Sequence, residues 1–130
     1  PPGTIRVIRV IRVHDALTRG TKALVPVRPG RVGMYVCGMT VQDRPHVGHV
    51  RAALAADAMR RWLGHRGFDV EHVSNFTDVD DKILERAARE GVPYEVVAER
   101  NIDAWFRVAD ACGGTRSRTA REGRASGRTR

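Results

Sequence analysis

The chain has 130 residues, of which 42% are hydrophobic and 29% charged, and its formal net charge is +8; this size and balance suit one domain with a packed core. It contains no run of 18 or more apolar residues, which argues against a membrane-spanning helix, and its first residues do not resemble a secretory signal. The two cysteines, Cys37 and Cys112, are far apart, so we expect a cytoplasmic protein without a disulfide framework.

The N-terminal residues form a short tandem repeat. Residues 5–13 read Ile-Arg-Val three times, and we interpret residues 1–13 as an extended arm or strand; a functional basic arm is the alternative. Pro26, Pro29 and Gly30 then mark a turn before the next predicted element.

A strand, a helix and a second strand are predicted next. The run from Val32 to Cys37 is bounded by glycines and predicts a buried strand. A helix is predicted over about residues 48–66, with Gly67 suited to its C-terminal end, and residues 68–75 read as a second strand. One apolar stripe of the helix is expected to face the core: Leu54, Ala55, Ala58, Met59, Trp62 and Leu63.

Two further helices are predicted after the second strand. Thr77 and Asp80 have the spacing of a capping box, which would start a helix that ends at Gly91. Pro93 fits the first turn of another helix. The expected buried side of this last helix carries four residues: Val97, Ile102, Trp105 and Ala109. Both tryptophans of the chain are therefore predicted to be core residues.

The order strand, helix, strand, helix, helix indicates an α/β fold with a parallel sheet. Ligands of such sheets bind at the carboxyl ends of the strands, which here are Cys37-Gly38 and residues 75–77. We place the main domain at residues 14–111. Residues 112–130 are predicted to be a disordered tail, because the segment from 113 onward has six arginines, one glutamate and no Leu, Ile, Val, Phe, Met, Trp or Tyr.

A histidine pair stands between the first strand and its helix, in the segment Pro45-His46-Val47-Gly48-His49. In a first helical turn, two histidines three residues apart share a face with the free backbone N–H groups and the positive dipole end. Such a turn can hold nucleotide phosphates, and Gly48 would permit close approach. A surface or structural histidine pair is an alternative reading, as is a metal site built from Cys37, His46 and His49 with a fourth ligand from elsewhere.

Three segments carry a resemblance to a known family: residues 35–43 (Tyr-Val-Cys-Gly-Met-Thr-Val-Gln-Asp), 45–49 (Pro-His-Val-Gly-His) and 73–83 (Val-Ser-Asn-Phe-Thr-Asp-Val-Asp-Asp-Lys-Ile). In this order and spacing they resemble cysteinyl-tRNA synthetases, and His46 to His49 corresponds to the His-Ile-Gly-His signature of class I synthetases. The resemblance spans about residues 12–111. It implies a partial Rossmann-like (HUP-type) nucleotide-binding domain with a parallel sheet, truncated before the site is complete.

The resemblance implies an enzyme that uses ATP to activate cysteine as cysteinyl-adenylate and transfers it to tRNA(Cys), acting as a cytoplasmic monomer. Cys37 would ligate a zinc ion that binds the substrate's sulfur, since zinc favours a thiolate over a hydroxyl. His46 and His49 would be catalytic and contact the ATP phosphates. The adenylate pocket would use these histidines and six further residues: Gly38, Met39, Thr40, Gly48, Asn75 and Thr77.

The sequence also departs from the family pattern. Ala52 replaces a common hydroxyl residue, Met39 replaces a common proline, and the family's remaining zinc ligands, its Lys-Met-Ser-Lys-Ser loop and its anticodon-binding domain have no counterpart. We therefore expect this chain alone to show little or no aminoacylation; robust cysteine-dependent ATP–pyrophosphate exchange would contradict that. Two alternatives stay open: a cysteine ligase of mycothiol biosynthesis, and a non-catalytic fragment whose basic tail binds RNA.

Overall fold

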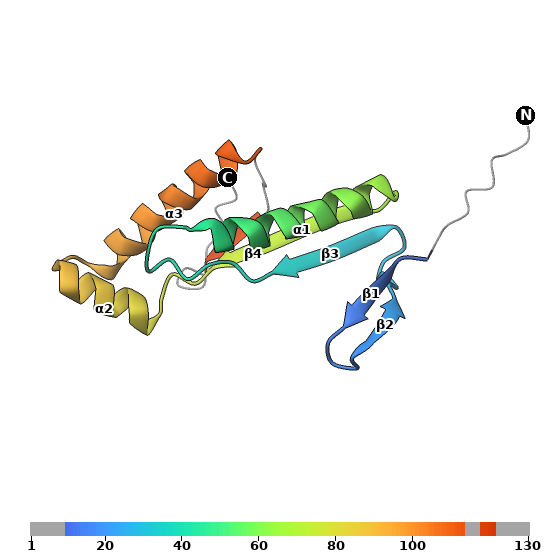
Figure 1. Cartoon of the computed structure of the whole chain (residues 1–130), viewed down its shortest axis with the longest axis horizontal. Helices are drawn as coiled ribbons and strands as arrows, with labels where there is room; N and C mark the ends of the chain where they lie inside the picture. Colours follow the sequence, from blue (N-terminus) through green and yellow to red (C-terminus); the bar gives the residue numbers. More distant parts are fainter. Residues whose placement is uncertain (1–9, 114–117, 122–130) are drawn as a thin grey trace, which may run out of the picture.

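The computed structural model describes residues 10–113 and 118–121 (Figure 1). A hairpin of β1 (Arg12–Asp15) and β2 (Gly20–Ala23) forms a separate two-stranded antiparallel sheet. Asp15 fixes its turn by accepting hydrogen bonds from the Leu17 backbone N–H at 3.0 Å and the Thr18 hydroxyl at 2.8 Å. Most of the predicted arm at residues 1–13 lies outside the described residues.

The main sheet contains β3 (Arg31–Val36), β4 (Asp69–Phe76) and β5 (Arg118–Arg121), in the order β3-β4-β5. All its pairings are parallel, and the register of the first pair sets Val32 beside Val70 and Val36 beside Ser74. The predicted α/β fold with a parallel sheet is confirmed, and both strands predicted for it lie within a residue or so of their expected bounds.

The strand β5 corrects the prediction that residues 112–130 are disordered throughout. Residues 118–121 pair with the second half of β4, from Val73 opposite Arg118 to Phe76 opposite Arg121. Parallel pairing uses backbone N–H and C=O groups, and these are present whatever the side chains are. A segment without large apolar residues can therefore be a strand that its side-chain pattern does not reveal.

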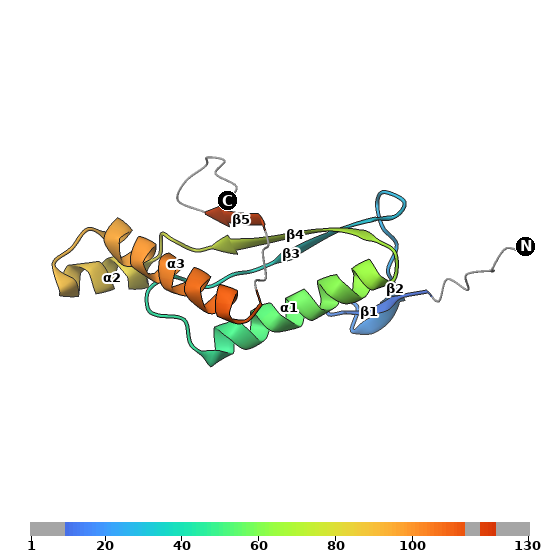
Figure 2. The same cartoon turned by 90° about the horizontal axis from the view of Figure 1, so that it is seen from above.

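The helix α1 (Val47–His65) packs against β4, on the same side of the sheet as α3 (Figure 2). Its buried residues are Ala56, Asp57 and Leu63. Of the stripe predicted to face the core, only Leu63 is buried, so that prediction is wrong for the other five residues. Trp62, for example, is 52% exposed. The helix carries apolar residues on two sides, and the side with Ala56 and Leu63 is the buried one.

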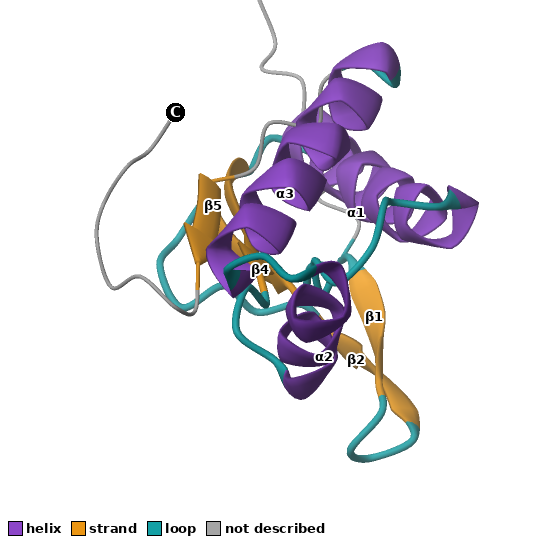
Figure 3. Ribbon diagram, turned by 90° about the vertical axis from the view of Figure 1, so that its left-hand side faces the viewer, coloured by secondary structure: helices purple, strands orange, loops and turns teal. Residues whose placement is uncertain are grey.

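The helices α2 (Asp81–Glu90) and α3 (Tyr94–Ala111) pack against each other at one end of the molecule (Figures 1 and 3). Asp80, not Thr77, caps α2, and its side chain accepts the Lys82 N–H at 2.9 Å. Gly91 ends α2 in the left-handed conformation with φ 67°, as predicted for a glycine. Pro93 is the N-cap of α3 rather than its first helical residue.

The principal core lies where α2 and α3 meet the ends of β3 and β4. It consists of eight buried residues: Met39, Val41, Phe76, Ile83, Ala87, Val97, Ala98 and Ile102. Trp105 is partly buried against this core, in line with its prediction. The buried Asn101 joins α3 to the loop after β3, because its side-chain amide donates to the Val41 carbonyl at 2.9 Å.

Candidate functional site

The site is built at the carboxyl ends of β3 and β4, which meet at Gly38 and Asn75. The Gly38 backbone N–H donates to the Asn75 side-chain oxygen at 2.8 Å. A Cβ atom at position 38 would stand 1.6 Å from the Asn75 backbone oxygen, so no residue other than glycine fits without moving the backbone. The two predicted strand ends are therefore in direct contact.

Pairing between the two chain segments continues beyond the strands. Thr40 and Thr77 form an isolated parallel bridge, with hydrogen bonds from the Val41 N–H to the Thr77 carbonyl at 3.1 Å and from the Thr77 N–H to the Met39 carbonyl at 3.2 Å. The segments 38–40 and 75–77 thus run side by side. Met39 itself is buried in the core.

The two signature histidines begin α1 and cap each other's backbone. His46 is the N-cap, and its Nδ1 accepts the Gly48 N–H at 3.1 Å, while the His46 N–H donates to Nδ1 of His49 at 3.2 Å. The two rings stack with their centroids 3.8 Å apart. This reciprocal arrangement is a capping box made by histidines, which was not predicted from the sequence.

The capping hydrogen bonds select the tautomer of both rings. Because each Nδ1 accepts a backbone N–H, a neutral ring carries its proton on Nε2. Burial, followed by the neighbouring His46, lowers the pKa of His49 below its ordinary value, which favours this neutral form. Each imidazole is then held by a backbone N–H of the same turn and keeps one Nε2–H donor for another molecule.

The structure explains the glycine at position 48 differently from the prediction. A Cβ atom at this position would lie 2.9 Å from a carbon of the His46 ring. A larger residue would therefore displace the capping imidazole of His46, whereas the prediction explained this glycine by the close approach of a ligand.

Cys37 follows β3 directly and its thiol is free and exposed. It lines a cavity of about 90 Å³ with the strand-end residues Gly38, Met39 and Asn75 and with His49 of α1. The thiol at the end of β3 and the imidazole of His49 in the first turn of α1 therefore face one cavity. Four of the predicted site residues are outside the lining of this cavity: Thr40, His46, Gly48 and Thr77.

Metal ligands are sparse around Cys37. No group of three or more His, Cys, Asp or Glu side chains within residues 10–113 and 118–121 is arranged to hold a metal ion. The alternative metal site of Cys37, His46 and His49 is therefore not formed. The accessible thiol suits zinc chemically, but a tetrahedral site would need its other ligands from outside the described part of the chain.

One buried polar residue of this region was not singled out by the sequence. His72 of β4 also lines the cavity, is 8% exposed, and has no hydrogen-bond partner for either ring nitrogen among the described residues. Its position on the α1-facing side of β4 follows from alternation along the strand, but a lone histidine in a strand gives no signal of a cavity beside it.

No helix in the described ranges is long and apolar enough to cross a membrane.

Comparison with known proteins gives consistent matches. The model of the family described as tRNA synthetases class I (C) catalytic domain matches residues 23–126. Cysteine–tRNA ligase of Geobacter metallireducens is 48% identical over 103 residues, or 79% of this chain and 21% of the relative. That of Beutenbergia cavernae is 46% identical, covering 79% of this chain and 22% of the relative. The chain therefore spans about a fifth of the length of these curated relatives.

A solved structure extends the match to the fold. Mycobacterium tuberculosis methionyl-tRNA synthetase in complex with methionyl-adenylate superposes with a TM-score of 0.65 at 29% identity, over 72% of this chain and 19% of the synthetase. The likeness covers most of this chain and agrees with the Rossmann-like fold that the motifs implied.

Proposed function

The chain belongs to the family of class I (C) tRNA synthetase catalytic domains, and from this premise we propose that it supplies the part of an active site that activates cysteine with ATP for transfer to tRNA(Cys). In the proposed reaction the carboxylate of cysteine attacks the α-phosphorus of ATP, and pyrophosphate leaves. The 3′-terminal hydroxyl of the tRNA then attacks the carbonyl carbon of cysteinyl-adenylate, and AMP leaves. The acceptor tRNA(Cys) is proposed from the names of the relatives.

One observation carries the proposal: Cys37, Asn75 and His49 line the same cavity at the carboxyl edge of the sheet. Ligands of α/β proteins bind at this edge. A thiol, an amide and an imidazole at the start of a helix come from three separate elements, and the family's motifs name all three positions. Their convergence supports the use of this edge for the reaction.

The histidine pair is proposed to stabilise the negative charge that develops on the phosphates. The Nε2–H groups of His46 and His49 are free to donate, because both Nδ1 atoms accept backbone hydrogen bonds. Donors fixed before the reaction stabilise a transition state without reorganising at that moment. The positive end of the α1 dipole adds to this effect.

The strand-end segments are proposed to hold the adenylate. Gly38, Met39, Thr40, Asn75 and Thr77 lie on two adjacent segments that are linked by hydrogen bonds. Because the backbones are held together, a ligand at this edge would meet a rigid surface. Met39 contributes through its backbone, since its side chain is buried in the core.

Zinc enters the proposal only through Cys37. When bound, zinc would supply a soft Lewis acid for the sulfur of the substrate cysteine. The exposed thiol of Cys37 can serve as one ligand. The residues described here do not complete a zinc site, so no step of the proposed reaction is derived from it.

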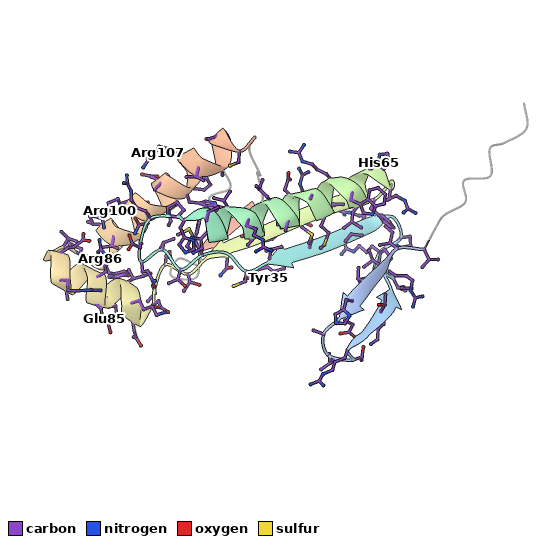
Figure 4. The ribbon with its side chains drawn as sticks, in the orientation of Figure 1. Tyr35, His65, Glu85, Arg86, Arg100 and Arg107 are labelled. Carbon is purple, nitrogen blue, oxygen red and sulfur yellow. The ribbon has the colours of Figure 1, made fainter. Side chains whose placement is uncertain are left out.

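The proposal is tested by calorimetric titration with a non-hydrolysable cysteinyl-adenylate analogue. Cys37→Ala and His46→Ala should each weaken binding by about tenfold or more, the size expected for losing a contact to a charged or polarised group. Two matched controls are available: Cys112→Ala removes the other exposed thiol, and His65→Ala removes an exposed histidine at the far end of α1 (Figure 4). Equal affinities across all five proteins would reject the proposal.

The titration also distinguishes the RNA-binding alternative. That reading predicts RNA affinity that falls steeply with salt and disappears when residues 113–130 are deleted. It predicts no dependence of analogue binding on Cys37 or His46.

A further inference from the structure

The cavity that holds the candidate site is also lined by residues to which the proposed reaction assigns no role. They are Ala53 and Ala56 of α1, Trp105 of α3 and His72 of β4. His72 lies beside Met34 in the register of the sheet. The imidazole is therefore enclosed between the sheet and two helices.

The two ring nitrogens of His72 are buried without hydrogen-bond partners among the described residues. Neither Nδ1 nor Nε2 has a hydrogen-bond partner within the described residues, and both atoms are buried. A neutral imidazole always carries one N–H donor and one acceptor nitrogen, so both functions are unmet by the protein. Buried polar groups in folded proteins are nearly always hydrogen-bonded, to protein or to ordered water.

The charges around His72 favour its neutral form. Burial lowers the pKa of His72, the Arg60 guanidinium lowers it further, and the Asp57 carboxylate acts in the opposite direction. Asp57 is itself occupied by Arg60 and Arg61, with hydrogen bonds of 2.7 and 2.6 Å. A neutral ring has one donor and one acceptor nitrogen, so an uncharged ligand that can both accept and donate a hydrogen bond would satisfy it.

The size of the cavity limits such a ligand. The whole cavity, including its part at Cys37, His49 and Asn75, has a volume of about 90 Å³, which is more than the roughly 10–15 Å³ that a cavity needs to hold one water molecule. Ser74, the next residue on the same side of β4, adds a hydroxyl to the lining. The site is thus roomy enough for more than one water molecule and has at least three polar atoms to hold them.

From these observations we propose that the part of this cavity around His72 is a hydrated site, in which a small cluster of ordered water molecules hydrogen-bonds to both ring nitrogens of His72. The alanine and tryptophan walls alone would favour a dry cavity, because apolar cavities of this kind stay free of water. The imidazole reverses that preference. The inference concerns this chain alone and does not depend on the proposed function.

The test is water-to-protein magnetisation transfer measured by NMR on the whole 130-residue chain. Long-lived water should give NOE and ROE cross-peaks of opposite sign at the methyl group of Ala56, which is 7% exposed. The methyl group of Ala87, buried in the α2–α3 core at 5% exposed, should give none and serves as the internal control. Absence of water cross-peaks at Ala56 would overturn the proposal.

Two variants and xenon sharpen the result. His72→Phe keeps a ring but removes both nitrogens, so the water cross-peaks should vanish and xenon should now shift the Ala56 methyl resonance. His65→Phe makes the same change at an exposed position of α1 and should leave the wild-type pattern intact. Should His72→Phe fail to fold, xenon on the wild type still decides: a xenon-induced shift at Ala56 in the native protein would show a dry cavity and refute the hydrated site.

Discussion

Around α2 and α3, the loops after β3 and β4 close over fully buried apolar side chains such as Ile83 and Ile102, at 0% and 1% exposed. Beneath α1, the helix and the sheet enclose small alanines, a buried carboxylate and an imidazole, and leave a cavity. The outer face of α1 is also apolar and exposed, with Leu54 at 43% and Met59 at 53%. Both regions touch the strand ends that carry the candidate site.

The difference suggests a division of roles. The closed region fixes the backbone of the segments 38–41 and 75–77, because Met39, Val41 and Phe76 belong to its core. The open region leaves space and polar groups beside Cys37 and His49. A rigid support next to a less tightly packed layer is what a ligand site at this edge requires.

The largest expected effect tests the closed region. Ile83→Ala should lower the free energy of unfolding by about 2–5 kcal/mol, because it removes a fully buried side chain from close-packed surroundings. Leu84→Ala is the matched control on the same helix, where the side chain is 46% exposed, and should change stability by less than about 1 kcal/mol. Urea denaturation measures both; similar losses would show that the core is not closed.

The next effect tests the buried carboxylate beneath α1. Asp57→Asn should lower the free energy of unfolding by about 1.5–3 kcal/mol, the range for losing a hydrogen bond to a charged group. Its partners Arg60 and Arg61 have side chains 34% and 62% exposed, so water can solvate them afterwards. The control is Asp103→Asn, at an exposed position of α3. An equally small loss in both variants would mean that Asp57 does not hold this layer.

The pH dependence of Asp57 should follow the same pairing. Burial raises its pKa, but the hydrogen bonds from Arg61 and Arg60 outweigh burial and leave the pKa below 3.8. Because the folded-state pKa is the lower one, this contribution is complete above the unfolded pKa and is lost as the pH falls below it. Asp57→Asn should therefore flatten the acid limb of the stability curve.

A smaller change in stability is expected from the titration of His72, which lies in the region beneath α1. Burial lowers the pKa of His72 below 6.5, so the unfolded chain binds the proton first. Stability should be unaffected above pH 6.5 and should decline as the pH falls through the range below it. His72→Phe should reduce that decline, which thermal unfolding at pH 7.5 and pH 5.5 would measure. An unchanged decline would show that His72 is not buried as described.

The smallest effect concerns the surface of the closed region. Glu90 pairs with Arg86 of α2 and Arg100 of α3, whose positions are labelled in Figure 4. The Arg100 and Arg86 hydrogen bonds lower the pKa of Glu90 to about 2. This contribution is present above the ordinary value of 4.5 and should disappear between there and pH 2, although exposed pairs stabilise little. Glu90→Gln should remove only this small pH-dependent contribution to the free energy of unfolding. A large loss of stability at pH 7 would contradict the prediction.

The sequence predicts the positions of most helices and strands well, but it does not predict which face of α1 is buried. The bounds of β3, α1 and β4 and the C-terminal end of α2 follow from glycines, prolines and runs of apolar residues, which are local signals. The inward face of α1 does not follow, because apolar residues occur on both of its sides and only the sheet decides between them. The strand β5 gives no side-chain signal, since backbone groups make its pairing.

The candidate site was predictable in part for the same reason. Motif order brought Cys37, the histidine pair and Asn75 to one edge of the sheet, and the structure places Cys37, His49 and Asn75 on one cavity. The mutual capping of His46 and His49 and the 1.6 Å clash that makes Gly38 necessary depend on contacts formed only in the fold. The enclosure of His72 depends on two helices and a strand at once.

The most direct test of the account is chemical-shift mapping with the cysteinyl-adenylate analogue on the labelled chain. Because the strand ends and the first turn of α1 form one cleft, backbone amide shifts should concentrate in residues 37–40, 46–49 and 75–77. The amides of residues 83–90 and 97–102 should move little. Shifts that concentrate elsewhere, or none at millimolar analogue, would contradict the claim that this edge of the sheet is the binding site.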